Sequence, residues 1–282
     1  MAYSTLISTA DLERHLSAPD WVIVDCTFDL TVPAWGFEEY QHAHIPGAVY
    51  ASLDKDLAGP VTQNTGRHPL PRLNQFEEKL SRWGIHKDSQ LVTYDNLGGA
   101  YAARLWWMVR QLGHSSIAVL DGGIPKWKQE GRPLCSGAEQ NRPAVFIAEC
   151  SPKWDLEVSE VERIRLDPAY LLIDARAPAR FRGEQEPIDP VAGHIPDAVN
   201  RFHGENLSAE GVFLPPEELR SQFLDLLHGI KPEHVVVYCG SGVTSCHHIL
   251  AMEVAGLPGA RLYPGSWSEW IRDPERPRAV GE

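Results

Sequence analysis

The stretch His-Ile-Pro-Gly-Ala-Val at residues 44–49 decides the fold, because the chain nearly repeats it as His-Ile-Pro-Asp-Ala-Val at residues 194–199. A short apolar run precedes each copy at a similar distance: Trp-Val-Ile-Val-Asp at 21–25 and Leu-Leu-Ile-Asp at 171–174. The two copies lie about half the chain length apart. A repeat of this kind predicts that one structural unit has been duplicated.

The repeat continues after these motifs. Gln-Leu-Val-Thr-Tyr-Asp at 90–95 matches Val-Val-Val-Tyr-Cys at 235–239, and Asp-Gly-Gly-Ile-Pro-Lys-Trp at 121–127 matches Pro-Gly-Ser-Trp-Ser-Glu-Trp at 264–270. Matches in the same order along both halves indicate that the halves share one topology and differ in the lengths of their loops.

The repeat also predicts the domain boundaries. Residues 1–134 form the expected first domain and residues 155–282 the second. Residues 135–154 between them contain Pro143 and Pro152 among mostly polar neighbours and lack the periodicity of a helix or strand. We therefore predict a linker there.

Each half alternates apolar runs with helical stretches, which indicates an α/β fold with a parallel sheet and helices on both of its faces. Each half should open with a capped amphipathic helix, capped by Ser8 or Thr9 in the first half and by Ser159 with Glu162 in the second. The predicted strands are 21–25, 90–94, 117–120, 171–174, 235–238 and 261–263.

The composition is that of a globular protein with an acidic surface. Of 282 residues, 43% are apolar, and 38 acidic side chains outnumber 26 basic ones, for a net charge of −12. This charge argues against nucleic acid as the main partner, and a small anionic ligand would need local positive potential. The first residues resemble no secretion signal, and no apolar run is long enough to span a membrane. We therefore expect a cytoplasmic protein.

Five cysteines, at positions 26, 135, 150, 239 and 246, form no Cys-x-x-Cys pair. An odd set of this kind favours reduced thiols over a disulfide framework or a zinc site. The histidine pairs at 42/44 and 247/248 lack the further ligands that a metal site needs. We predict neither a metal nor an organic cofactor.

One cysteine differs from the others in its setting. The predicted strand 235–238 runs into Cys-Gly-Ser-Gly-Val-Thr at 239–244, and a helix is expected over 245–255. A glycine-rich turn before a helix points backbone N–H groups inward, and such a nest lowers the pKa of a thiol. Cys239 is therefore the predicted nucleophile. Burial in the core is the expectation for Cys26, Cys135 and Cys150. Cys246 is expected to pack, although its position would also let it face the loop.

The paired His-Ile-Pro motifs, the loop at 239–244 and Gly-Ser-Trp-Ser-Glu-Trp at 265–270 together resemble the rhodanese and 3-mercaptopyruvate sulfurtransferase family. The resemblance covers nearly the whole chain. It implies two tandem rhodanese-like domains and a sulfurtransferase that carries sulfur as a persulfide on Cys239. The first-half counterpart of Cys239 is Asp95, so the first domain resembles an inactive duplicate.

The residues after Cys239 bear on the sulfur donor. Thiosulfate-preferring members of the family resemble Cys-Arg-Lys-Gly-Val-Thr, whereas Gly240 and Ser241 here resemble the branch that uses 3-mercaptopyruvate. A phosphatase would need arginine at position 245, where this chain has serine. The expected partners are a small anionic donor and an acceptor such as thioredoxin, glutathione or cyanide. A thiosulfate-preferring enzyme and a persulfide carrier with little turnover on small donors remain alternatives.

The resemblance also implies helper residues. Ser241 would handle protons and charge together with His68 and Asp54, both from the first domain; on the residues alone, His68 could be solvated and Asp54 could cap a turn. Arg180 would grip the donor's carboxylate or sulfonate. The remaining expected substrate-binding residues belong to the loop: Gly240, Gly242, Val243 and Thr244.

Two further residues complete the prediction. Asp174, the last residue of its strand, would orient Arg180 or the loop, although Asp25 occupies the same place in the inactive half. The mercaptopyruvate branch carries a second arginine before the second His-Ile-Pro motif, but residues 186–193 contain no cation. Arg182 is the candidate replacement, and this departure leaves the donor open.

Overall fold

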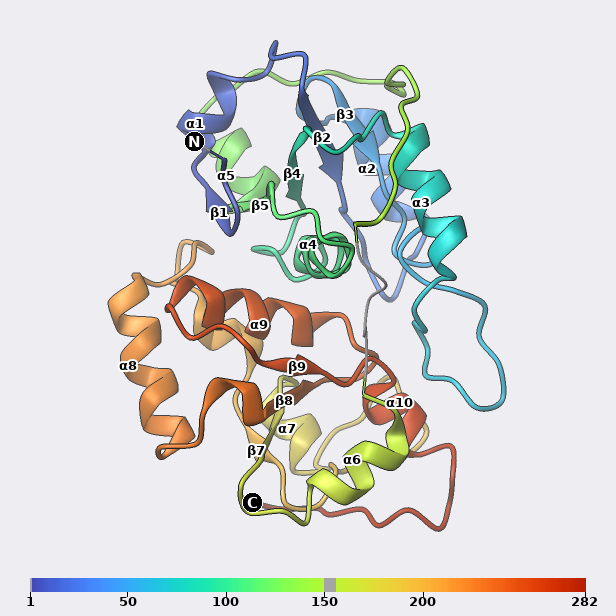
Figure 1. Cartoon of the computed structure of the whole chain (residues 1–282), viewed down its shortest axis with the longest axis vertical. Coiled ribbons are helices and arrows are strands. Elements are labelled where there is room, and N and C mark those ends of the chain that lie inside the picture. Colours follow the sequence, from blue (N-terminus) through green and yellow to red (C-terminus); the bar gives the residue numbers. More distant parts are fainter. Residues whose placement is uncertain (1, 150–155) are drawn as a thin grey trace. The chain divides into compact units, whose positions relative to one another are not determined.

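The computed structural model describes residues 2–149 and 156–282, which group into two compact units (Figure 1). Unit 1 falls within Met1–Gly59, Leu70–Lys153 and Ala209–Phe213; unit 2 falls within Pro60–Pro69, Trp154–Ser208 and Leu214–Glu282. The units differ from the expected domains 1–134 and 155–282, because residues 60–69 group with unit 2 and residues 209–213 with unit 1. The described part of the predicted linker, residues 135–149, also groups with unit 1. Among the described residues, no helix has both the length and the apolar character needed to cross a membrane.

Unit 1 is built on a parallel sheet. The predicted strands are confirmed, because β2, β4 and β5 have the expected bounds, and their residues are almost all buried. Strands buried on both faces read as continuous apolar runs, which is why the sequence revealed them. The order across the sheet is β1 (Leu6–Ile7), β5 (Ile117–Leu120), β4 (Gln90–Tyr94), β2 (Trp21–Asp25) and β3 (Ala48–Tyr50).

Helices flank both faces of this sheet (Figure 1). The first one is capped as predicted, since the Ser8 hydroxyl accepts a hydrogen bond from the Asp11 N–H at 3.0 Å. The core beneath the helices includes the fully buried Trp127. The helices of unit 1 are α1 (Thr9–Glu13), α2 (Trp35–His42), α3 (Leu73–Arg82), α4 (Ala102–Gln111) and α5 (Gly123–Gln129).

Unit 2 repeats the plan with a four-stranded parallel sheet. Asp174 and Tyr238 pair at the carboxyl ends of their strands, so the residues that follow emerge at one edge of the sheet. Ligands of open parallel sheets bind at such edges. The order is β7 (Val199–Asn200), β6 (Leu171–Asp174), β8 (Val235–Tyr238) and β9 (Arg261–Leu262), and the last is one residue shorter than predicted.

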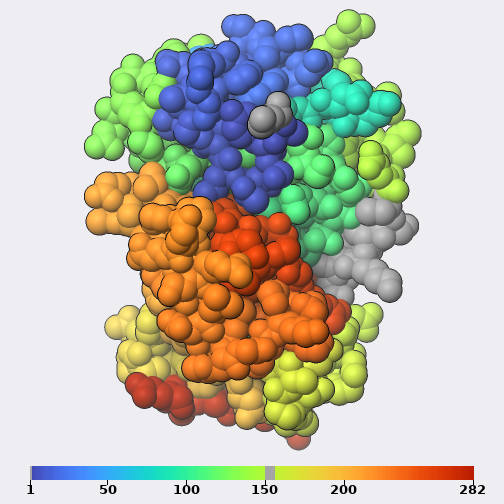
Figure 2. Space-filling model, turned by 60° about the vertical axis from the view of Figure 1, so that its left-hand side comes forward, coloured from blue at the N-terminus to red at the C-terminus, as the bar shows by residue number. Residues whose placement is uncertain are grey.

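Helices again pack on this sheet. On the amphipathic α8, Leu219, Phe223 and Leu227 are buried one turn apart, and Figure 2 shows the orange segment that includes α8 at the surface. The helices of unit 2 are α6 (Val158–Ile164), α7 (Pro178–Phe181), η1 (His203–Asn206), α8 (Pro216–Leu227), η2 (Pro232–His234), α9 (Thr244–Val254) and α10 (Ser266–Trp270).

The predicted capping box at α6 is wrong. The N-cap of this helix is Glu157, which makes no side-chain capping bond, and Ser159 already lies inside the first turn. Glu162 forms an ion pair with Arg276 instead of reaching back to the helix start. The pair explains why this glutamate does not cap.

The repeated His-Ile-Pro motif has the same structural task in both units. The N–H of Ile45 donates to the Tyr94 hydroxyl at 3.2 Å, and the N–H of Ile195 donates to the Tyr238 hydroxyl at 3.1 Å. Both tyrosines end a central strand and are buried. The motif therefore fastens a loop to the carboxyl edge of the sheet, and the duplication is structural as well as sequential.

Candidate functional site

Cys239 lies at the carboxyl edge of the unit 2 sheet, directly after β8 and with only 2% of its surface exposed. The start of α10 holds its backbone: the Cys239 N–H donates to the Ser266 hydroxyl at 3.1 Å, and the Trp267 N–H donates to the Cys239 carbonyl at 3.0 Å. These two hydrogen bonds fasten the residue after β8 to the start of α10 (both elements are labelled in Figure 1), and so fix the position of the sulfur.

The loop after Cys239 curls tightly and needs glycine at one position. Gly242 has a φ of +75°, and a Cβ there would lie 2.3 Å from the Pro264 carbonyl oxygen. Gly240 is less constrained by backbone, because its Cβ would first meet the end of a flexible side chain, Arg67, at 2.8 Å. The turn can therefore point its N–H groups inward as the sequence predicted.

The surroundings of Cys239 favour a thiolate. Burial alone would raise the pKa of this thiol, but hydrogen bonds from the Thr244 and Ser245 side chains and from the backbone of Ser241 and Ser245 outweigh it, and the pKa is lowered. The Ser245 hydroxyl lies 3.5 Å from the sulfur. Helix α9 begins at Thr244, one residue before the predicted start, so its N-terminus also faces the sulfur.

His68 is brought to Ser241. The distance between His68 Nδ1 and Ser241 Oγ is 2.7 Å, and both side chains are buried. Although His68 comes from the first half of the chain, it belongs to unit 2. Its loop is anchored there, since the N–H of the preceding Arg67 donates to the Ser268 hydroxyl at 3.0 Å.

Asp54 lies in an exposed turn of unit 1. In this turn the carboxylate of the neighbouring Asp56 accepts the Ser52 N–H at 2.8 Å. Both alternatives for Asp54, a capping role and a part in catalysis, stay predictions.

Arg180 lies on α7 and is held in place by two carboxylates. Its Nη2 lies 2.7 Å from Glu186 Oε1 and 3.1 Å from Asp189 Oδ2. Both acids are almost fully buried, whereas the arginine side chain keeps 17% of its surface exposed. The two acids thus fix the orientation of the guanidinium, and part of the arginine side chain stays accessible.

Arg67 is a site residue that the sequence reasoning missed. Its guanidinium binds Asp189 through Nε at 2.9 Å and Nη2 at 3.3 Å, so Asp189 bridges Arg67 and Arg180. Both guanidinium groups lie close to Gly240. The segment expected to supply a second arginine supplies Asp189 instead. The sequence feature that points to Arg67 is its place directly before His68, the predicted catalytic histidine.

Asp174 orients a different arginine from the one predicted. Its carboxylate accepts hydrogen bonds from Arg176, the shortest at 2.7 Å from Nη2. Arg176 in turn lies 3.3 Å from Glu186, which holds Arg180, so Asp174 acts on Arg180 only through this chain. Arg176 can reach Asp174 because it follows this residue by only two positions at the end of the strand.

Arg182, the other predicted cation, pairs with Glu184 at 2.8 Å, and a third of its side chain is exposed. The structure therefore places Arg67, and not Arg182, as the second guanidinium beside the loop.

Comparisons with known proteins agree with this geometry. A family model described as "Rhodanese-like domain" matches residues 8–130 and 157–273. The chain belongs to the rhodanese family. A Pseudomonas aeruginosa protein named "Probable 3-mercaptopyruvate sulfurtransferase" is 46% identical over 100% of both chains. "Putative thiosulfate sulfurtransferase SseB" from Mycobacterium tuberculosis is 39% identical over 98% of this chain and 97% of its own.

A solved rhodanese structure is similar over almost the whole chain. The crystal structure of the 3-mercaptopyruvate sulfotransferase SseA from Escherichia coli has a TM-score of 0.81 and 29% identity, covering 94% of this chain and 100% of its own. These matches confirm the predicted α/β fold of two rhodanese domains and the predicted enzyme class: the chain is a sulfurtransferase.

The other cysteines of this rhodanese are accounted for within the described residues. Cys26 is buried as predicted, and Cys246 packs below the loop with its thiol donating to the Gly242 carbonyl at 3.5 Å. Cys135 is only partly buried, which corrects the prediction of a core residue, because its backbone pairs with His44 at the edge of unit 1. The prediction for Cys150 lies outside the described residues. Within residues 2–149 and 156–282, no cluster of His, Cys, Asp and Glu could hold a metal ion.

Proposed function

We propose that this rhodanese moves sulfur from 3-mercaptopyruvate, in preference to thiosulfate, to a thiol or cyanide through a persulfide on Cys239. The observation that carries the proposal is the 2.7 Å contact between Ser241 and His68 beside a buried thiol of lowered pKa. Cleaving the carbon–sulfur bond of mercaptopyruvate needs such proton handling, whereas releasing sulfite from thiosulfate does not.

In the first step the Cys239 thiolate attacks the donor's sulfur. The new bond joins the two sulfur atoms, the carbon–sulfur bond breaks, and its electron pair passes to carbon as pyruvate enolate. The enolate takes up one proton and leaves as pyruvate. Ser241, hydrogen-bonded to His68, would donate to the developing oxyanion and relay that proton. Asp54 is proposed as a further member of this relay.

In the second step an acceptor removes the outer sulfur. A thiolate attacks it, the new disulfide-type bond forms, the bond to Cys239 breaks, and the electron pair returns to the Cys239 sulfur. With cyanide the product is thiocyanate. Thioredoxin and glutathione are proposed thiol acceptors. No disulfide joins any of the four cysteines that the structure describes, which supports a reducing, cytoplasmic setting.

Arg180 and Arg67 would hold the donor's carboxylate. Among the described residues, the Nη1 of neither arginine has a hydrogen-bond partner, whereas their other nitrogens bind Glu186 and Asp189. A planar guanidinium fits a carboxylate through paired hydrogen bonds. The backbone of residues 240 and 242–244 would line the same place.

A preference for thiosulfate is the second candidate, favoured by one observation. Two guanidinium groups close to Gly240 could together hold a doubly charged donor. The absence of a cation at positions 240 and 241 argues against it.

Steady-state assays with each donor and cyanide test the proposal. We expect kcat/KM for 3-mercaptopyruvate to exceed that for thiosulfate at least roughly tenfold, since only the former uses the Ser241–His68 pair. A higher kcat/KM for thiosulfate would contradict the choice of donor but leave sulfur transfer intact. A chain that transfers sulfur from neither donor, yet accepts it from a partner protein, would be a persulfide carrier.

A further inference from the structure

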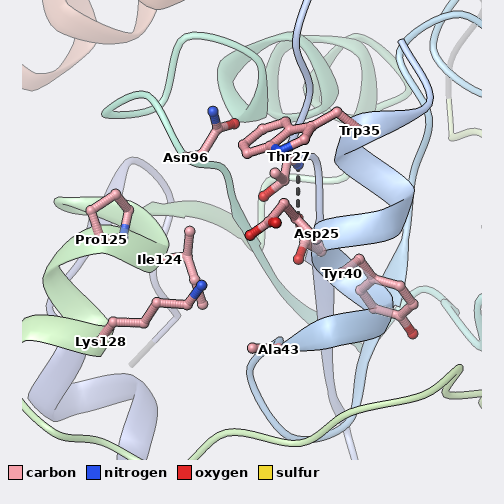
Figure 3. Close-up of a pocket in the computed structure, with 10 residues that line it drawn as sticks. Asp25, Thr27, Trp35, Tyr40, Ala43, Asn96, Ile124, Pro125 and Lys128 are labelled. Atoms are coloured by element: carbon pink, nitrogen blue, oxygen red, sulfur yellow. Dashed lines mark hydrogen bonds between the residues drawn. The ribbon is translucent and has the colours of Figure 1, made fainter. Parts of the chain in front are cut away.

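Unit 1 contains a cavity at the carboxyl edge of its own sheet, the place that corresponds to the reactive edge of unit 2. Figure 3 shows it between the end of β2, helix α2 and helix α5. Its volume is about 230 Å³. Asp25 and Thr27 form its floor, and Trp35, Ile124 and Lys128 stand around it.

The same place in unit 2 is filled by a side chain of the protein itself. In each unit the residue two positions after the strand's last aspartate donates its N–H to that carboxylate: Thr27 to Asp25 at 2.7 Å, and Arg176 to Asp174 at 2.9 Å. The Arg176 guanidinium then folds back onto Asp174. Thr27 is too short to do so, and the cavity beside Asp25 is the space that a guanidinium would fill.

A second difference in residue type between the two units enlarges the cavity. Ile124 donates its N–H to the Asp95 carbonyl at 3.0 Å, just as Trp267 does to the Cys239 carbonyl at 3.0 Å, so these two residues are equivalent. In unit 2 the Arg176 guanidinium lies over the Trp267 ring, 5.0 Å from its centre. In unit 1 the smaller isoleucine leaves this space open, and the indole of Trp35 lies on another side of the cavity (Figure 3).

The cavity in unit 1 and the corresponding place in unit 2 also differ in the sign of the charge beside them. In each unit the motif histidine bonds through Nδ1 to the carbonyl of an aromatic residue, Tyr40 or Phe181, at 2.7 and 2.8 Å. The residue before this aromatic is Glu39 in unit 1 and Arg180 in unit 2. Glu39 lines the cavity. An acid therefore stands where the reactive unit has a cation.

Asp25 supplies a second acid that lacks a counter-ion. It is 2% exposed, and in the part of the chain that the structure describes it forms no ion pair, whereas Asp174 pairs with Arg176. Burial raises the pKa of Asp25 to about 6 despite hydrogen bonds from Thr27. Lys128, exposed at the mouth, is the one cation among the lining residues. The net charge of the lining is negative once Asp25 is ionised.

We propose that this cavity binds a small monosubstituted guanidinium compound, which pairs with Asp25 and Glu39 and stacks on Trp35. The ligand would replace in unit 1 what Arg176 provides in unit 2, where the guanidinium also meets two acids and one indole. The proposal does not depend on sulfur transfer at Cys239.

Titration calorimetry of the intact protein with methylguanidinium chloride, at constant ionic strength and pH 8, tests the proposal. We expect saturable binding at one site. Thr27→Arg should abolish it, because the chain's own guanidinium then occupies the cavity, and Thr27→Ser is the matched control that should bind as the native protein does.

Two variants of opposite sign make the test sharper. Glu39→Gln should weaken binding roughly tenfold, because it removes a negative charge that pairs with the guanidinium. Lys128→Met should strengthen binding a few-fold, because it removes a like charge. Glu39 and Lys128 are at least partly exposed, so neither change should unfold the protein.

Three results would overturn the proposal. One is the absence of saturable binding by the native protein. Another is binding that Thr27→Arg and Glu39→Gln leave unchanged. The third is equal affinity for methylammonium, which has no planar group to stack on Trp35.

Discussion

The Asp95 loop of unit 1 and the Cys239 loop of unit 2 are two forms of one anion nest. In unit 1 the Asp95 carboxylate accepts four backbone N–H groups, at 2.7 to 2.9 Å, from the turn that follows it: Leu97, Gly99, Tyr101 and Ala102. Unit 1 thus fills the nest permanently with a side chain of its own.

In unit 2 the corresponding turn surrounds the Cys239 sulfur, whose pKa it lowers although this side chain is buried. Burial raises the pKa of Asp95, and its four N–H donors oppose that rise. The comparison teaches that the fold supplies inward-pointing donors in both copies, and that the residue at the strand end decides between a structural and a reactive anion.

The largest expected effect follows from removing the reactive anion. Cys239→Ser should abolish transfer from both donors to below the detection limit, because a serine hydroxyl is neither ionised nor able to hold sulfane sulfur. Assays with cyanide measure this. Cys246→Ser is the matched control and should keep most of the activity, since a hydroxyl can also donate to the Gly242 carbonyl. Full activity of Cys239→Ser would show that Cys239 is not the reactive anion, and the contrast between the Cys239 loop and the Asp95 loop would then be wrong.

The next effect concerns proton handling, which only the reactive loop needs. Ser241→Ala and His68→Asn should each lower kcat with 3-mercaptopyruvate roughly 10²-fold, the usual contribution of general acid–base catalysis. With thiosulfate the loss should be much smaller, because sulfite leaves without a proton. Steady-state kinetics with both donors give the two losses. Equal losses would show that the pair supports the loop and does not act on the donor.

A smaller effect is expected for the cations beside the loop. Arg67→Gln should raise KM for 3-mercaptopyruvate roughly tenfold or more, since charge-assisted hydrogen bonds to the carboxylate are lost. Asp189→Asn should raise KM less, because it loosens both guanidinium groups without removing them. Kinetics of these variants are compared with those of Arg182→Gln, a partly exposed control. An unchanged KM in Arg67→Gln would remove this residue from the site.

The smallest effect on activity should come from the silent loop. Asp95→Asn leaves one oxygen to serve four N–H groups, so unit 1 should lose about 1–3 kcal/mol of unfolding free energy. Thermal denaturation measures this, with the exposed Asp20→Asn as control. Activity of the folded variant should stay near native. Unaltered stability would mean that the carboxylate does not support its turn.

The sequence predicted the sheets and the nucleophile because their signals are local. Buried parallel strands are continuous apolar runs, and the turn after Cys239 needs Gly242 next to Pro264. The Ser241–His68 contact, between residues far apart in the chain, came from the family resemblance and not from spacing.

What the sequence did not predict depends on which charges meet in three dimensions. Asp174 is expected to orient Arg180 or the loop, but its carboxylate binds Arg176, two residues away in the chain. The sequence alone does not place Arg67 in the site, because its partner, Asp189, is distant in the chain and is an acid in the segment where the resemblance implies a cation. The predicted capping box at Ser159 does not form, and Glu162 makes an ion pair with Arg276 instead. Local motifs do not show such competition between long charged side chains.

The most direct test of the central claim is the mass of the protein after incubation with 3-mercaptopyruvate and no acceptor. We predict the gain of one sulfur atom, located by peptide mapping on Cys239, lost again on adding cyanide, and absent from Cys239→Ser. Finding the sulfur on Cys246, or finding none while pyruvate is released, would contradict a persulfide held in the nest of unit 2.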